Sequence, residues 1–81
     1  MSGEEVSRLN TWLQLHPMAW HGWPTFGVVE GREAKARLDR LQQAGCPFIG
    51  RRGLLREVDE QVRQIRAHRY SEYCRQVERS W

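Results

Sequence analysis

The sequence predicts a mainly α-helical domain that carries one small β-hairpin between its second and third helices. Apolar residues recur every three to four positions over residues 3–15, 32–44 and 57–79, which is typical of amphipathic helices. In residues 48–55, two very short apolar runs flank a four-residue turn with a glycine at each end. Such a pattern indicates two strands joined by a hairpin loop.

The chain is long enough for one small domain, which we expect to cover residues 1–81. A chain of this size buries only about 60% of its unfolded surface. We therefore expect marginal stability, or stability that depends in part on a partner.

The first helix is predicted over residues 3–15. Ser2 and Glu5 have the spacing of a capping box, in which each side chain satisfies a backbone N–H at the start of a helix. The apolar stripe that follows consists of Val6, Leu9 and Leu13, with Trp12 at its edge. Pro17 excludes the residue before it from the helical region, so the helix should stop at His16.

The connection over residues 17–31 is rich in aromatic side chains and interrupted by glycine and proline. Part of it could be a short helix that starts near Pro17, and residues 25–30 could form a strand that pairs with the hairpin. The least expected residues are Met18, Trp20 and Trp23. They could complete the core, form a patch that binds a protein partner, or stack on unpaired bases.

The second helix, residues 32–44, has one narrow apolar stripe made by Ala34, Leu38 and Leu41. Gly45 can close its C-terminus, and Pro47 prevents it from resuming. The face opposite the stripe carries Arg32, Lys35, Ala36, Asp39, Arg40 and Gln43. Such a face could lie in a major groove of DNA or could simply be solvated. Asp39 would repel phosphates unless it accepts a hydrogen bond from a cytosine amino group.

Three arginines belong to the predicted hairpin and its exit, namely Arg51, Arg52 and Arg56. Guanidinium groups suit phosphate oxygens because they offer a planar fork of donors. These arginines could follow a DNA backbone, or they could only keep a short hairpin soluble.

The third helix is predicted over residues 57–79, and its acidic first turn complements the helix dipole. One apolar stripe, Val58, Val62 and Ile65, should close the core. A second, displaced stripe consists of Tyr70, Tyr73, Val77 and Trp81. We expect it to dock within the chain, on residues 18–26, with docking on a second copy as the alternative. Between the stripes lies a basic collar that could touch phosphate or be solvated: Arg63, Arg66, His68 and Arg69.

The composition argues against metal, membrane and enzymatic functions. Cys46 and Cys74 lie far apart with no CxxC spacing, so we expect buried, reduced cysteines and no zinc site. No cofactor and no small-molecule substrate is expected, because no nucleophile has a neighbouring base and no glycine loop could hold a phosphate. The absence of a leader pattern and of a long apolar run favours a cytoplasmic protein that does not bind membranes.

Charge is distributed unevenly along the chain. The net charge is +3, but residues 1–31 hold one arginine against three glutamates, and residues 32–81 hold twelve basic against seven acidic residues. The basic half is thus the half that contains the second helix and the hairpin. A nucleic acid is the partner that such a half favours.

One stretch resembles a known family. The run ARLDRLQQAGCPFIGRRGLLREVD at residues 36–59 is similar to the second half of the excisionase and AlpA-type winged helix-turn-helix proteins of phages and mobile elements, which are related to the MerR DNA-binding domain. The shared pattern is a helix, a glycine, a variable residue, a proline, two short strands around a glycine-arginine turn, and an acidic helix start. The resemblance is limited to roughly residues 32–62. It implies a winged helix-turn-helix fold, with 32–44 as the recognition helix and Arg51 and Arg52 on the wing.

These observations lead to two functional hypotheses. The first is a small protein that binds duplex DNA as an excisionase-like architectural factor or a transcriptional regulator, with the exposed face of residues 32–44 toward the bases and the arginines of residues 51–56 on the backbone. The alternative is a protein-interaction module, such as an inhibitor or adaptor encoded by a phage. Its contact residues would be Met18, Trp20, Trp23, Tyr73 and Trp81.

Overall fold

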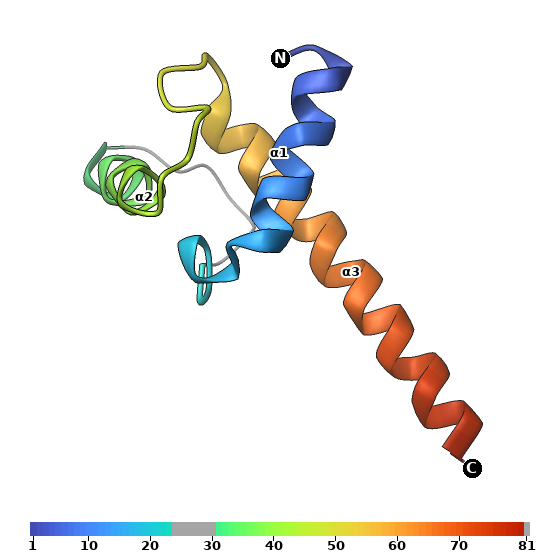
Figure 1. Cartoon of the computed structure of the whole chain (residues 1–81). Coiled ribbons are helices and arrows are strands. Elements are labelled where there is room, and N and C mark those ends of the chain that lie inside the picture. The colour runs from blue at the N-terminus through green and yellow to red at the C-terminus, as the bar shows by residue number, and fades with distance from the viewer. Residues whose placement is uncertain (24–30, 81) are drawn as a thin grey trace.

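The structure is a computed structural model and describes residues 1–23 and 31–80. Within these residues it contains the α-helices α1 (Gly3–Leu15), α2 (Gly31–Gln43) and α3 (Leu54–Ser80), and a short 3₁₀ helix, η1 (Pro17–Ala19). Helix α1 packs against the first half of α3, and α2 lies to one side of this pair (Figure 1). The second half of α3 projects away from the other elements, which gives the molecule extents of 47 × 27 × 21 Å.

Helix α1 has the predicted bounds, and its ends are set by the predicted local signals. The Ser2 hydroxyl accepts a hydrogen bond from the Glu5 N–H at 3.3 Å, as a helix N-cap does. At the other end, the His16 N–H donates to the carbonyl oxygens of Trp12 (3.0 Å) and Leu13 (3.3 Å), and Pro17 follows. The predicted stop at His16 is confirmed.

Helix α2 also ends as predicted. Gly45 has a φ of 86°, in the left-handed region that closes helices. The Gly45 N–H donates to the Gln42 carbonyl and the Cys46 N–H donates to the Leu41 carbonyl, both at 3.0 Å. This pair of bonds is a Schellman motif, and the buried Leu41 and Cys46 side chains supply the apolar contact that accompanies it.

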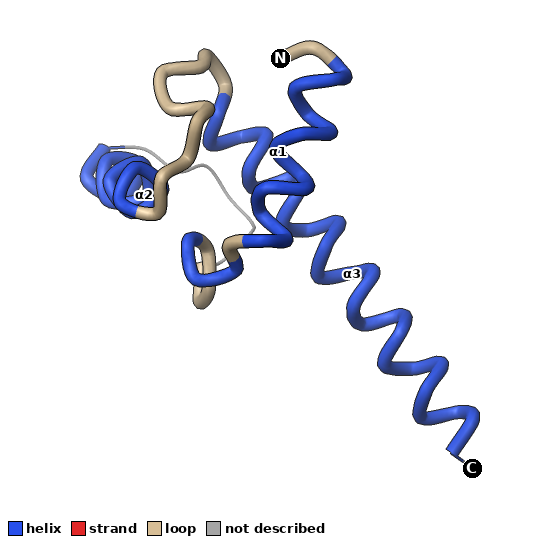
Figure 2. Tube along the Cα trace, viewed as in Figure 1, coloured by secondary structure: helices blue, strands red, loops and turns tan. Residues whose placement is uncertain are grey.

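The β-hairpin predicted over residues 48–55 is wrong, because none of the residues that the structure describes is in a strand (Figure 2). Residues 47–53 form successive turns instead. The Arg51 N–H donates to the Phe48 carbonyl at 3.1 Å, and the Leu54 N–H donates to the Arg51 carbonyl at 3.2 Å. Gly50 supplies the positive φ of 91° that this path needs.

The physical reason for the correction is that Phe48 and Leu54 are both buried in the core. Apolar runs of two residues are too short to sustain a ladder of strand hydrogen bonds, whereas a tight series of turns places both side chains inward. Leu54–Leu55 then begins α3, three residues before the predicted start at Glu57. The fold is therefore all-helical in the described residues, and a winged helix-turn-helix with a β-hairpin is not what this chain forms.

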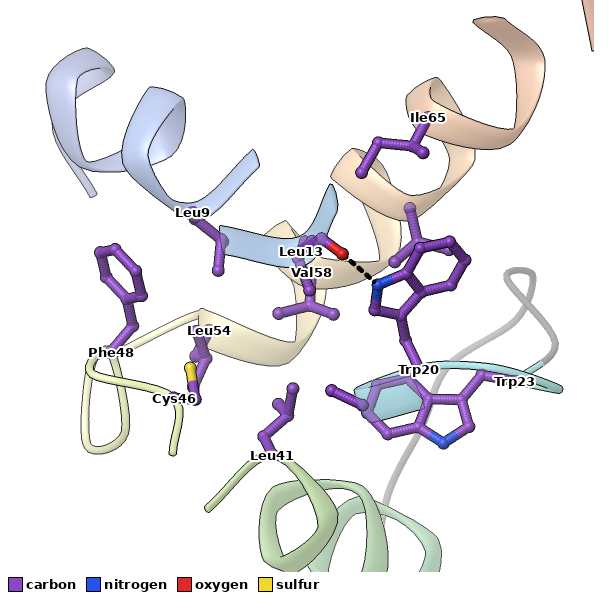
Figure 3. Packing of buried hydrophobic residues seen from close by; sticks show 12 residues of the cluster. Leu9, Leu13, Trp20, Trp23, Leu41, Cys46, Phe48, Leu54, Val58 and Ile65 are labelled. Atoms are coloured by element: carbon purple, nitrogen blue, oxygen red, sulfur yellow. Dashed lines mark hydrogen bonds between the residues drawn. The ribbon is translucent and has the colours of Figure 1, made fainter. Parts of the chain in front are cut away.

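The core lies where α1, η1 and the first half of α3 meet (Figure 3). It contains Leu9 and Leu13 of the predicted α1 stripe and the whole first stripe of α3, with Leu41 contributed by α2, whereas Val6 is only partly buried. Trp20 is only 4% exposed, and its indole N–H donates to the Leu13 carbonyl at 2.8 Å, so its one polar atom is satisfied. Trp23 is buried as well, so both tryptophans complete the core, which was one of the three expected possibilities. The strand expected over residues 25–30 falls outside the described residues.

The second stripe of α3 does not dock within the chain, so that expectation is wrong for the described part of the stripe. Tyr70 is 69% exposed and Tyr73 is 64% exposed, because α3 extends past the end of α1 at this point (Figure 1). A helix of 13 residues cannot cover one of 27 residues. Trp81 lies outside the described residues.

Replacing Leu13 by alanine should lower the free energy of unfolding by about 2 to 5 kcal/mol, because it opens a cavity in the core. Leu13 has no exposed surface, whereas Leu15 on the same helix is 72% exposed. Leu15→Ala is the matched control and should change stability by less than about 0.5 kcal/mol. Urea denaturation followed by circular dichroism compares the two, and equal losses would mean that α1 presents a different face to α3.

Candidate nucleic-acid interface

Helix α2 turns a polar face away from the core. At about 100° per residue, five of the six residues predicted to face bases fall on one side of the helix. All five are exposed in the structure: Arg32, Lys35, Ala36, Asp39 and Gln43. We refer to these five residues as the outer face of α2. It carries two cations, one anion and a small residue that lets another surface approach.

Arg40, the sixth residue predicted for this face, turns toward the protein. Its guanidinium donates to the Met18 carbonyl at 2.7 Å and lies 5.6 Å from the centroid of the Trp23 ring. Its side chain is therefore occupied in joining α2 to the connection after α1. Its assignment to the outer face is corrected.

Arg37 is the residue that sequence reasoning missed. It is only 4% exposed, and its guanidinium donates to Asp59 of α3 and to Glu33 of α2, each at 3.1 Å. It also lies 5.2 Å from the centroid of the Trp23 ring. Two features of the sequence could have indicated that Arg37 turns inward. It lies about 40° from Leu41 around the helix, beside the apolar stripe, and Glu33 precedes it by four residues.

The turn before α3 lies beside α2. A hollow of about 230 Å³ is lined by Leu38 of α2 together with residues of the turn and the start of α3, among them Arg51 and Arg56. Arg51, Arg52 and Arg56 are all exposed. Arg51 also lies 3.9 Å from a carboxylate oxygen of Glu5, a long and solvated contact that contributes little. The turn and the start of α3 thus present three cations next to α2, although they do not form a β wing.

The residues expected to bind a protein partner do not gather in one place. Trp20 and Trp23 are in the core, while Met18 and Tyr73 are exposed on different elements. Met18 lies on η1, which packs beside α1, and Tyr73 lies on the projecting half of α3 (Figure 1). Trp81 is not among the described residues.

Cys46 is buried, as expected, whereas Cys74 is only partly buried. Burial raises the pKa of the Cys46 thiol, against a smaller opposite effect of a backbone hydrogen bond at Phe48, and the thiol form is the unreactive one. In the part of the chain that the structure describes, no three His, Cys, Asp or Glu side chains come together as metal ligands would. Over the same residues, no helix has the length and apolar character needed to cross a membrane.

Comparison of the chain with protein-family models, with curated proteins and with solved structures finds no match. The resemblance to excisionase and AlpA-type proteins therefore stays a prediction, and its β wing is excluded by the structure.

Removal of the carboxylate of Asp59 should destabilise the fold, because it takes away one of the carboxylates with which the buried guanidinium of Arg37 is paired. We expect Asp59→Ala to lower the free energy of unfolding by on the order of 3 kcal/mol, and Arg37→Met with Asp59→Leu to recover most of that loss. The control is Glu4→Ala, which removes an exposed ion pair with Arg8 and should cost no more than about 0.5 kcal/mol. Chemical denaturation measures all three, and full stability of Asp59→Ala would show that Arg37 is solvated.

Proposed function

We propose that this protein binds duplex DNA, with the outer face of α2 in the major groove and the arginines of the turn on the adjacent phosphate backbone. The observation that carries the proposal is that α2 packs on the protein through one side and offers cations on the other, beside three further exposed cations. An α-helix fits the major groove, and most protein contacts to DNA are made to phosphate oxygens.

The residues of the outer face suit distinct contacts. Arg32 and Lys35 can reach guanine edges or phosphates, Gln43 can pair with an adenine edge, and Ala36 can contact a thymine methyl group. Asp39 opposes phosphate but can accept a hydrogen bond from a cytosine amino group, so it favours some sequences over others. A charged face of this mixed kind supports sequence preference rather than uniform binding.

The proposed biological role is that of a small transcriptional regulator or an excisionase-like architectural factor in DNA recombination. Selection of bound duplexes from a random pool separates the two. A regulator should enrich one short motif read by α2, whereas an architectural factor should enrich deformable sequence steps.

Arg51→Ala combined with Arg52→Ala should weaken DNA binding without unfolding the protein, because both side chains are exposed. If each contacts one phosphate, the slope of log K against log salt concentration should fall by about one to two units. Fluorescence anisotropy of a labelled random duplex at several salt concentrations measures the slope, and melting curves check the fold.

The matched control replaces Arg75 and Arg79, two exposed arginines near the end of α3, by alanine. It removes the same charge and should leave the slope nearly unchanged. Binding of the intact chain with no salt dependence, or no binding at all, would refute the proposed function. An unchanged slope in the folded Arg51 and Arg52 variant would remove the turn from the interface.

A second candidate function, a protein-interaction module, is favoured by the exposed stripe on the projecting half of α3. Tyr70, Tyr73 and Val77 fall within an arc of about 60° around the helix, and all three are exposed. Exposed aromatic side chains in a line on one helix are typical of a surface that packs on another protein. A second copy of this chain is the simplest such partner.

If the stripe joins two copies, the intact chain should sediment as a dimer at high concentration, and its melting temperature should rise with concentration. Tyr70→Ser with Tyr73→Ser should then sediment as a monomer under the same conditions. Ser71→Ala, an exposed position between the two tyrosines on another side of α3, is the control and should remain dimeric. Monomeric behaviour of the intact chain at every concentration would exclude self-association through this stripe.

A further inference from the structure

Two arginines of α3 stack on one tryptophan. The guanidinium carbon of Arg66 lies 5.4 Å from the centroid of the Trp20 ring, and that of Arg69 lies 5.6 Å from it. Contact with a tryptophan face fixes a guanidinium in place while its N–H groups remain open to acceptors at the ring edge. Arg66 and Arg69 are one helical turn apart on α3, so Trp20 fixes two cations on the same stretch of this helix.

This pair differs from the two arginines that stack on Trp23. Arg37 is ion-paired with carboxylates, and Arg40 donates to a backbone carbonyl. In the described part of the chain, neither Arg66 nor Arg69 has an ion pair or a hydrogen bond to an acceptor.

The acidic residues nearest along α3 already have other partners. Glu60 pairs with Arg63 at 3.4 Å, and Glu72 pairs with Arg75 at 3.3 Å. The two guanidiniums on Trp20 therefore repel each other without compensation from a described carboxylate. An anion bound beside them would relieve that repulsion.

A polar hollow of about 340 Å³ opens beside Arg69, between α1 and α3. Its lining consists of Asn10, Gln14, Gln64, Ile65, His68 and Arg69. None of the described residues in this lining is acidic, and the side chains of Gln14, Gln64, His68 and Arg69 all carry N–H groups. The side-chain amides of Gln14 and Gln64 each donate one hydrogen bond within their own helix and keep a second N–H.

We propose that His68 and Arg69, which both line this hollow, form a binding site for a phosphate group of a nucleic-acid backbone, and that Arg66 on the same Trp20 ring adds positive charge beside it. The inference rests on the proposed DNA binding and adds a phosphate contact on α3, separate from the outer face of α2 and the turn. Phosphate is the anion of choice because guanidinium forks bind its oxygens in bidentate fashion and an imidazole N–H adds a third donor. The stacking on Trp20 orders the arginine side chains before the ligand arrives, which lowers the entropy cost of binding.

The first test uses inorganic phosphate and does not depend on DNA binding. Nuclear magnetic resonance should show saturable shifts of the Arg66 and Arg69 Nε–H signals and of the His68 ring on addition of phosphate, with chloride at equal ionic strength as the reference. Arg66→Gln with Arg69→Gln should abolish the shift at His68, while the control Arg75→Gln with Arg79→Gln should keep it. No saturable shift in the intact chain, or an equal shift with chloride, would overturn the site.

The second test asks whether the phosphate belongs to a nucleic-acid backbone. Random duplex DNA should displace inorganic phosphate from the site, and Arg66→Gln with Arg69→Gln should lower the salt slope of duplex binding by about one to two units. The control on Arg75 and Arg79 should leave that slope unchanged. If phosphate binds but duplex neither displaces it nor depends on Arg66 and Arg69, the site takes a free phosphate and the backbone assignment is wrong.

The two proposals fail in different ways. Loss of salt dependence only in the Arg51 and Arg52 variant would keep the proposed function and overturn the α3 contact. Saturable phosphate binding at His68 without any affinity for duplex DNA would overturn the proposed function and, with it, the assignment to a backbone phosphate.

Discussion

The position of α2 depends on the buried ion pair between Arg37 and Asp59. Apart from Leu41 and the partly buried Leu38, α2 offers few apolar side chains to the core, so the charged contact to α3 decides how the helix is rotated. A buried guanidinium tolerates few orientations, because its N–H groups must meet acceptors at fixed angles. Trp23 beneath the guanidinium adds a flat surface that limits the geometry further. The outer face of α2 points to solvent because Arg37 points inward.

The sequence was sufficient wherever a structure is set by residues close together in the chain. The cap at Ser2, the stop at His16 and the glycine at Gly45 all act over one helical turn, and each was predicted correctly. The inward turn of Arg37 and Arg40 was not predicted, because their acceptors, Asp59 and the Met18 carbonyl, lie 22 residues away in opposite directions. An arginine is assigned to a solvated face by default, and only the folded chain reveals its partner.

The hairpin was predicted wrongly for a different reason. Phe48–Ile49 and Leu54–Leu55 are short enough to fit a strand, a turn or the start of a helix, and periodicity cannot separate these cases. In the folded chain α3 starts at Leu54, with Glu57 in its first turn, and this start buries the Leu54 side chain. The outer face of α2 was predicted correctly from periodicity, as α1 was, because the exposure of side chains on an amphipathic helix follows the helical period. The α3 site around Trp20 was suggested only as a basic collar, because the tryptophan that organises it is more than forty residues away.

Helix α3 has two halves with different physical support. Its first half is held by buried side chains from α1 and from the core, while the residues after Arg69 extend into solvent (Figure 1). An isolated helix shorter than about 12 to 15 residues is marginal in water, so this outer half should exchange its amide hydrogens far faster than the inner half does. A partner that binds the outer half of α3 would also have to order this part of the helix. The ordering cost lowers the affinity of such a contact and lets the strength of the contact respond to temperature and to single changes in helix propensity.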